Sequence, residues 1–471
     1  MPIFYMHKDS TKSESSINLS QKRVLVVEDF FSFRLTLKNM LRSFNITDID
    51  EAASGEEAIR KIAVRRYDII LCDYNLGPGK DGQQVLEEAK HREYINYTTI
   101  FMMVTAENTL DMFMGALEYQ PDHYLMKPFT KDVLEKKIID LIRKKENLKD
   151  IDQAIEKRDH TTVVKLCEEL IEKNVKNLSE LLKLKGEFLI KAERYQEAEA
   201  FYTKVLGMGN LPWASLGLGR VKFDTGRYEE SKDIFEKIIA KNNKLMPAYD
   251  WLSKAHEKMG QFQEAQQILM QATELSPRAI LRQKALGNLA YTNNDLAIAE
   301  KAFKETIKQG KHSFFKSPTD YTTLAKVLTD KGTAEDGIKV LSEAQKEFPD
   351  NPEAAMQISL VECFTYNAMN KPAEAATAAK KALNASLTFE GRLPPDMELD
   401  MAKAFFLTGD SAKGTDLVRR IVQSNHEDQD KIGQVQKMFK DLHMESQGDE
   451  IVSVARDEIS SLNNEGVRLV R

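Results

Sequence analysis

A regular spacing of small residues beyond position 190 limits most strongly how this chain can fold. Small side chains recur at intervals of 33 to 39 residues, at Ala198, Ser231, Ala265, Ala299, Gly337, Ala375 and Gly414. Four residues after each comes a mostly bulky side chain, at Tyr202, Phe235, Leu269, Phe303, Leu341, Ala379 and Val418. Residues four apart lie on one face of a helix. The spacing therefore predicts one closely packed helix in each interval.

Each interval also contains a turn before its small residue, such as Gly226-Arg227 or Gly260-Gln261. Gly219 and Gly287 lie in the preceding helical stretch, where a close neighbour would need a small side chain. A helix, a tight turn and a second helix form the predicted unit, and repetition at this period is typical of a solenoid. These features resemble the tetratricopeptide repeat, and the match is best between residues 179 and 313. The resemblance implies a surface that binds protein partners.

Residues 23–145 show a different pattern, in which short apolar runs alternate with amphipathic stretches. Strands are predicted at 23–28, 67–73, 99–105 and 123–126, with a weaker one near 47, and helices at 33–44, 55–66, 82–91, 109–117 and 131–144. Near-continuous apolar runs suit strands that are covered on both faces. The alternation predicts an α/β doubly wound fold with a five-stranded parallel sheet, followed by the all-α solenoid.

Polar residues follow the predicted strands. Glu28 and Asp29 end the first strand, Asp73 ends the third, Thr105 ends the fourth, and Lys127 follows the fifth. The carboxyl ends of parallel strands line one crevice, so these side chains should converge. Three crowded carboxylates repel one another, and a hard divalent cation such as Mg²⁺ would neutralise them. Asp73 can then attack an activated phosphorus atom, while Lys127 and Thr105 stabilise the phosphoryl oxygens.

The residues ED at 28–29, CDYN at 72–75, TA at 105–106 and YLMKPF at 124–129 resemble the receiver domain of two-component response regulators. The resemblance implies a flavodoxin-like fold with phosphorylation at Asp73. It implies that Mg²⁺ is held by Glu28 (mainly through water), Asp29, Asp73 and the backbone carbonyl of Asn75. It also implies the catalytic and switch residues, which are Thr105, Tyr124 and Lys127.

Three further expectations come from the same resemblance. The peptide bond between Lys127 and Pro128 should be cis. Asn75 and Glu107 should flank the path of a hydrolytic water and tune dephosphorylation, and because both are polar we expect a short-lived phosphoryl group. The loop GPGKDG at 77–82 has one apparent extra residue relative to the family pattern.

A weaker signal concerns the predicted groove of the solenoid. The residue after the small position of each first helix should face this groove, and in successive units it is Glu187, Arg220, Lys254, Asn288 and Lys326. Three cations and an amide could bind an acidic or carboxylate-bearing peptide. An ordinary solvated surface is the competing interpretation.

Composition excludes several classes of protein. Sixty-seven basic and 73 acidic side chains give a formal charge of −6, so no nucleic-acid partner is expected. The sequence has no run of about 18 apolar residues, so no membrane span is expected. The three cysteines form no CxxC, and neither a disulfide framework nor a zinc site is predicted. We expect a cytoplasmic protein.

Four segments follow from these patterns: a flexible tail at 1–22, the receiver domain at 23–145, a solenoid of about seven to eight units at 146–425, and a helical cap or incomplete repeat at 426–471. The predicted function is that of a response regulator, phosphorylated on Asp73 by a sensor histidine kinase or phosphotransfer protein, that signals through protein binding by its repeats. No enzymatic activity is expected beyond self-phosphotransfer and autodephosphorylation. Two alternatives remain: a constitutive scaffold with a silent receiver, and a transcription regulator that acts through the helical region.

Overall fold

The computed structural model describes residues 18–106, 119–173, 177–388, 393, 395–425 and 428–469. The chain forms two compact units. The first comprises Met1–Arg282 and His312–Phe314, and the second comprises Gln283–Lys311 and Phe315–Arg471. The helix predicted at 109–117 lies outside the described residues.

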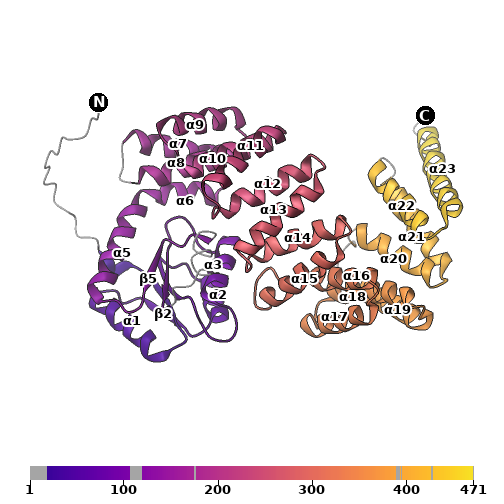
Figure 1. Cartoon of the computed structure of the whole chain (residues 1–471), viewed down its shortest axis with the longest axis horizontal. Coiled ribbons are helices and arrows are strands. Elements are labelled where there is room, and N and C mark those ends of the chain that lie inside the picture. The colour runs from indigo at the N-terminus through magenta and orange to yellow at the C-terminus, as the bar shows by residue number, and fades with distance from the viewer. Residues whose placement is uncertain are drawn as a thin grey trace. The chain divides into compact units, whose positions relative to one another are not determined.

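The first unit begins with a five-stranded parallel sheet (Figure 1). Its strands are β1 Val24–Val27, β2 Ile49–Ala52, β3 Ile69–Asp73, β4 Ile100–Thr105 and β5 His123–Met126. The described helices around it are α1 Phe31–Ser43, α2 Gly55–Val64, α3 Gly82–His91 and α5 Lys131–Lys145. The strand order is β2-β1-β3-β4-β5, so the order reverses between β1 and β3. The predicted doubly wound fold is confirmed, and the reversal places the ends of β1 and β3 beside the ligand crevice of such sheets.

Alternating side chains of each strand pack on opposite faces of the sheet, which explains the continuous apolar runs. In β1, Val24 and Val26 belong to a buried cluster with α1 and α5 residues, whereas Leu25 and Val27 belong to one with α2 and α3 residues. Both faces of the sheet are therefore covered by helices.

The segment expected to be a flexible tail is partly ordered. Residues Leu19–Gln21 form a short 3-10 helix, η1, whose N-cap is Asn18. The Leu19 side chain is buried in the cluster between the sheet and helices α1 and α5. The prediction of a flexible tail is wrong for these residues, because a single apolar side chain anchors them to the core.

Among the described residues after β5, helices are the only regular elements. In the first unit they are η2 Glu146–Leu148, α6 Lys149–Glu156, α7 His160–Glu172, α8 Leu178–Lys191, α9 Tyr195–Met208, α10 Pro212–Asp224, α11 Tyr228–Lys241, α12 Met246–Lys258 and α13 Phe262–Leu275. The division between the units falls within α14 Ile280–Thr292. In the second unit they continue as α15 Leu296–Gly310, α16 Pro318–Asp330, α17 Ala334–Glu347, α18 Pro352–Ala368, α19 Pro372–Leu387, α20 Pro395–Leu407, α21 Ser411–Ser424, α22 Gln429–Asp441 and α23 Glu445–Leu469.

The small and bulky residues of the repeat pack as the spacing predicts. The small residues from Ala198 to Gly414 are all buried. A Cβ atom added at Gly219 would lie 2.6 Å from a ring atom of Phe235, and one added at Gly287 would lie 2.8 Å from a ring atom of Phe303. In each of these two repeats, the first helix is therefore in direct contact with an aromatic ring of the second helix.

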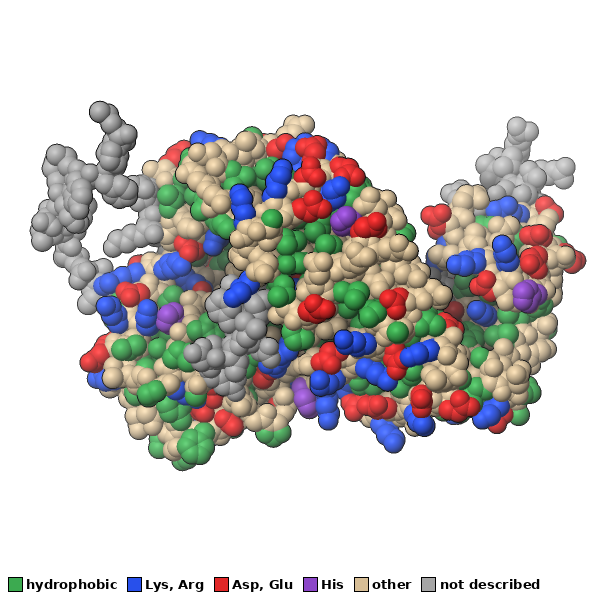
Figure 2. Space-filling view, viewed as in Figure 1, with side chains coloured by type: hydrophobic (Ala, Val, Ile, Leu, Met, Phe, Trp, Pro, Cys, Tyr) green, Lys and Arg blue, Asp and Glu red, His purple; other side chains and the backbone are tan. Residues whose placement is uncertain are grey.

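Acidic and basic side chains are intermixed over the face of the molecule shown in Figure 2. This distribution agrees with the small net charge of the sequence. Among the described residues, no helix combines the length and the apolar character that a membrane span requires.

Candidate functional site

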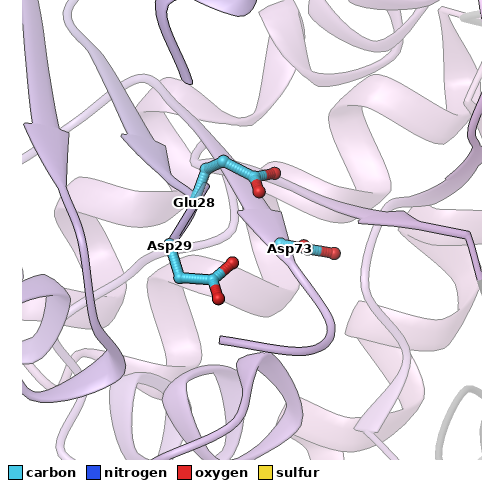
Figure 3. A group of neighbouring side chains, drawn as sticks. All are labelled: Glu28, Asp29 and Asp73. Carbon is cyan, nitrogen blue, oxygen red and sulfur yellow. The ribbon is translucent and has the colours of Figure 1, made fainter. Parts of the chain in front are cut away.

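Three carboxylates meet at the carboxyl ends of β1 and β3 (Figure 3). The oxygen atoms that Glu28, Asp29 and Asp73 offer as ligands all lie within 4.8 Å of one another. Glu28 and Asp73 are buried and Asp29 is exposed, so the group is open to solvent on one side. The structure thus confirms that the predicted acids converge at the point where the strand order reverses.

The acids line a cavity of ≈ 590 Å³ at this edge of the sheet. Other predicted site residues in its wall are Asn75, Thr105 and Lys127. The Thr105 side chain is buried at the end of β4. The backbone N–H of Gly77 donates a hydrogen bond of 3.2 Å to Oδ1 of Asn75, which fixes the loop that follows the Asp73 strand.

The ammonium group of Lys127 joins two of the carboxylates. Its Nζ lies 2.9 Å from Oε2 of Glu28 and 2.9 Å from Oδ2 of Asp73. The same atom lies 4.4 Å from the ring centroid of Phe33, which is a cation–π contact. Two acids and an aromatic ring therefore hold the lysine over the cavity.

Burial shifts the acid–base equilibria of this group. It raises the pKa of the Asp73 carboxyl, although the hydrogen bond and charge of Lys127 oppose the rise. Burial likewise raises the pKa of Glu28, against the hydrogen bond from Lys127 and with added repulsion from Asp73. Burial disfavours the charged form of Lys127, but its hydrogen bonds to Asp73 and Glu28 outweigh this and raise its pKa. The raised carboxyl pKa values show that burial disfavours the charged carboxylates more than Lys127 favours them.

These features fit a hard divalent cation. Carboxylate and carbonyl oxygens are the ligands that Mg²⁺ prefers, and it usually binds through one or two carboxylates while keeping several waters. Glu28, Asp29 and Asp73 offer oxygen atoms at suitable separations beside an open cavity. No sulfur or imidazole ligand takes part in this group, so a softer metal is disfavoured.

Close packing of the loop after β3 explains a glycine at its end. A Cβ atom added at Gly82 would lie 2.1 Å from the backbone oxygen of Asp73. The N–H of Gly82 donates a hydrogen bond of 2.9 Å to the carbonyl oxygen of Tyr74. Two glycines of this loop have left-handed backbone conformations that favour glycine, Gly77 with φ 72° and Gly79 with φ 110°.

Comparison with known proteins agrees with this geometry. A family model for the response regulator receiver domain matches residues 24–139, and two tetratricopeptide repeat models match residues 189–252 and 247–278. Chemotaxis protein CheY of Pseudomonas aeruginosa is 33% identical over 116 residues, which cover 25% of this chain and 92% of that protein. The chain belongs to the response regulator receiver family.

Further similarities cover one domain or the other of this response regulator. Chemotaxis protein CheY-3 of Vibrio cholerae is 29% identical over 125 residues, which cover 26% of this chain and 94% of that protein. A tetratricopeptide repeat protein from Parabacteroides merdae, known from its crystal structure, is 15% identical. It aligns with 57% of this chain and 99% of its own, with a TM-score of 0.34.

The remaining predicted residues of the receiver domain have different outcomes. The peptide bond between Lys127 and Pro128 is cis, as expected. Tyr124 lies in β5, half-buried against the side-chain cluster on the α2 and α3 face, and burial raises the pKa of its phenol. Glu107 lies outside the described residues. The roles of Thr105 and Tyr124 as a switch pair, and of Asn75 and Glu107 in dephosphorylation, stay predictions.

The predicted groove residues are divided between the two units. Arg220 on α10 and Lys254 on α12 share one indole ring in the first unit: the Cζ of Arg220 and the Nζ of Lys254 lie 5.4 and 4.7 Å from the ring centroid of Trp251. Asn288 on α14 and Lys326 on α16 belong to the second unit. The structure therefore brings the first two cations together.

Glu187, the first residue of the predicted groove series, contacts the receiver domain, and its side chain is 38% exposed. Both of its carboxylate oxygens lie 3.4 Å from the phenol oxygen of Tyr97. No local pattern predicts this contact, since the two residues are 90 positions apart and neither belongs to a recognised motif.

A second contact, beside Asp73, could not be predicted from the sequence. The guanidinium group of Arg278 reaches Tyr74 and Asp81, which lie at the two ends of the loop after Asp73. A separation of 197 residues between Arg278 and Asp81 leaves no local pattern that could reveal the pair.

Proposed function

We propose that this protein is a phosphorylation-dependent regulator whose receiver domain accepts a phosphoryl group on Asp73 and whose repeat region binds a protein partner. The observation that carries the proposal is the group of three carboxylates beside Lys127 and Thr105. We further propose that the donor is a sensor histidine kinase or a phosphotransfer protein, and that the protein acts in the cytoplasm.

The reaction needs little from the chain beyond these residues. A carboxylate oxygen of Asp73 forms a bond to the donor phosphorus while the bond from phosphorus to the leaving group breaks, which leaves an acyl phosphate. Lys127 offers positive charge to the phosphoryl oxygens, and the Thr105 hydroxyl can donate a hydrogen bond to one of them. When bound to Glu28, Asp29, Asp73 and the carbonyl of Asn75, Mg²⁺ would neutralise charge on the same oxygens.

Exposed aromatic side chains beside the cavity favour a protein as the donor. Phe30 is 67% exposed and Phe31 is 66% exposed, directly after Asp29. Aromatic residues are enriched at protein–protein interfaces, and large exposed apolar side chains next to a reactive group suit a docking surface. We propose that the phosphodonor contacts the start of α1.

Phosphoryl uptake should depend on a divalent cation. Full-length protein incubated with acetyl phosphate and Mg²⁺ should gain one HPO₃ group in an intact mass spectrum, with release of acetate. Excess EDTA should reduce the fraction of labelled protein at least tenfold, because the three carboxylates then repel the incoming anion. Equal labelling in EDTA and in Mg²⁺ would show that no cation takes part.

The repeat region is the proposed output surface. Reversing two charges beside Trp251, with Arg220→Glu and Lys254→Glu together, should weaken the capture of an acidic partner at least tenfold in a quantitative pull-down. The matched control is Lys237→Glu with Lys241→Glu, which reverses two exposed lysines of α11. The groove proposal is wrong if the two double variants retain the same proteins in the same amounts.

The two alternative functions predict different experimental results. A constitutive scaffold would show no effect of a phosphodonor on partner binding. A transcription regulator would bind duplex DNA with an affinity that falls steeply as salt rises. We propose no enzymatic activity other than self-phosphotransfer and autodephosphorylation at Asp73.

A further inference from the structure

Arg278, in the segment that joins α13 to α14, contacts the receiver domain. Its Nη1 donates a hydrogen bond of 2.7 Å to the phenol oxygen of Tyr74, and its Nη2 lies 2.6 Å from Oδ2 of Asp81. Its Cζ also lies 6.0 Å from the ring centroid of Tyr74. The ion pair is partly buried, since the Arg278 and Asp81 side chains are 33% and 20% exposed.

These two contacts fall at opposite ends of the loop that follows the phosphorylation site. Tyr74 is adjacent to Asp73, and its backbone N–H is bonded to the carbonyl of Val104 in the neighbouring strand. Asp81 caps α3, because its Oδ1 accepts a hydrogen bond of 2.8 Å from the N–H of Gln84. One arginine therefore joins the end of β3 to the start of α3, with residues 75–80 between them.

Lys80, which directly precedes Asp81 in this loop, makes further contacts. The N–H of Lys80 donates a hydrogen bond of 2.9 Å to Glu56, and its Nζ lies 3.1 Å from Glu88. The same Nζ donates to the backbone oxygen of His312, which belongs to the same compact unit. The part of the loop that lines the cavity, at Asn75 and Gly77, lies between these fixed points.

The receiver domain and the repeats of the first unit share a second contact, which lies at Tyr97 and Asp152. Tyr97 of the receiver domain packs against the buried cluster of the first repeats. The carboxylate of Asp152 on α6 accepts hydrogen bonds of 2.9 and 2.8 Å from the backbone N–H groups of Tyr97 and Thr98. Two separate contacts, at Asp152 and at Arg278, therefore join the repeats of the first unit to the receiver domain.

We infer that Arg278 is a positioning residue of the phosphorylation site, supplied by the repeat region; this inference rests on the proposed function. By holding Tyr74 and Asp81, it restricts the conformations of the loop that carries Asn75 to the cation. A loop fixed before binding loses less entropy when the cation arrives, so affinity rises. By thermodynamic linkage, the bound cation strengthens the contacts of Arg278 by the same factor.

The test measures cation binding directly. Mn²⁺ binding to full-length protein is measured by EPR of the free ion, with Mg²⁺ as competitor. Arg278→Ala should raise the Mn²⁺ dissociation constant three- to tenfold and increase deuterium uptake of residues 74–82. Arg278→Lys keeps the charge but not the forked geometry, and should recover part of the affinity. The matched control is Arg194→Ala, which removes a turn arginine paired with Glu197 within its own repeat and should change the constant less than twofold.

A double-mutant cycle shows whether Arg278 acts through the loop. Tyr74→Phe removes only the phenol oxygen, and its effect should not add to that of Arg278→Ala. Asp81→Asn keeps an oxygen that can cap α3 but loses the charge, and should weaken binding in the same direction even if the alanine variant fails to fold. Fully additive effects would overturn the inference.

The outcomes separate this inference from the proposed function. If the wild-type protein binds Mn²⁺ at a site that Asp73→Asn abolishes, and Arg278→Ala binds equally well, only the inference is wrong. If the wild-type protein shows no binding that depends on Asp73, the proposed function itself fails.

Discussion

Replacing Asp73 with Asn should abolish phosphoryl uptake from acetyl phosphate. The wild-type protein should gain a single HPO₃ group in the presence of Mg²⁺, and the variant should gain none. The amide that replaces the carboxylate is neutral, so it is neither a competent nucleophile nor an anionic ligand for the cation. Intact mass spectrometry of both proteins after the same incubation provides the measurement.

Asp68→Asn is the matched control for this experiment. Asp68 immediately precedes β3, at the end of the strand opposite Asp73, and pairs with Lys22 at 3.4 Å and with Arg23 at 3.8 Å. Its replacement should leave phosphoryl uptake unchanged. Labelling of the Asp73→Asn variant at the wild-type level would place the acceptor elsewhere. Absence of labelling in all three proteins would favour the silent-receiver alternative.

Phe235→Ala should destabilise the repeat region around it. The Phe235 side chain is fully buried, and its ring contacts the backbone of α10 where Gly219 leaves room for it. Removal of a buried phenylalanine side chain leaves a cavity and costs about 3–5 kcal/mol of unfolding free energy. Because neighbouring helices of a solenoid stabilise one another, the loss should appear as faster hydrogen exchange in α10, α11 and α12.

The control for this stability prediction is Phe262→Ala at the start of α13. Phe262 is 42% exposed, so the same substitution removes less buried area and should cost less than about 1.5 kcal/mol. Hydrogen exchange and urea unfolding of the two variants give the comparison. Equal loss of stability in both variants would contradict the packing role assigned to Phe235.

Local patterns were sufficient to predict the fold of the receiver domain and the position of its acids. Asp29 and Asp73 could be placed together because each ends a strand, and parallel strands end at one edge of their sheet. A close approach at Gly219 could be predicted because the repeat period places this glycine in the first helix of its repeat, which packs against the second. In both cases the geometry of regular backbone elements determines which residues of the sequence lie close together in space.

Other features could not be predicted, because they depend on contacts between distant segments. Leu19 is ordered because its side chain is buried between the sheet and helices α1 and α5. Distant segments form this pocket, so no short stretch of sequence predicts it. Glu187 contacts Tyr97 because the receiver domain lies against the first repeats, whereas its place in a groove stays a prediction.

The sequence by itself determined the two architectures of this protein and the convergence of its acids at one edge of the sheet, since backbone periodicity and strand ends are local properties. Only the tertiary structure decided that Arg278 reaches Tyr74 and Asp81. A solenoid places each side chain by adding small rotations from one helix pair to the next. The position of Arg278 relative to the sheet depends on all of these rotations together. The spacing of residues in the sequence does not predict it.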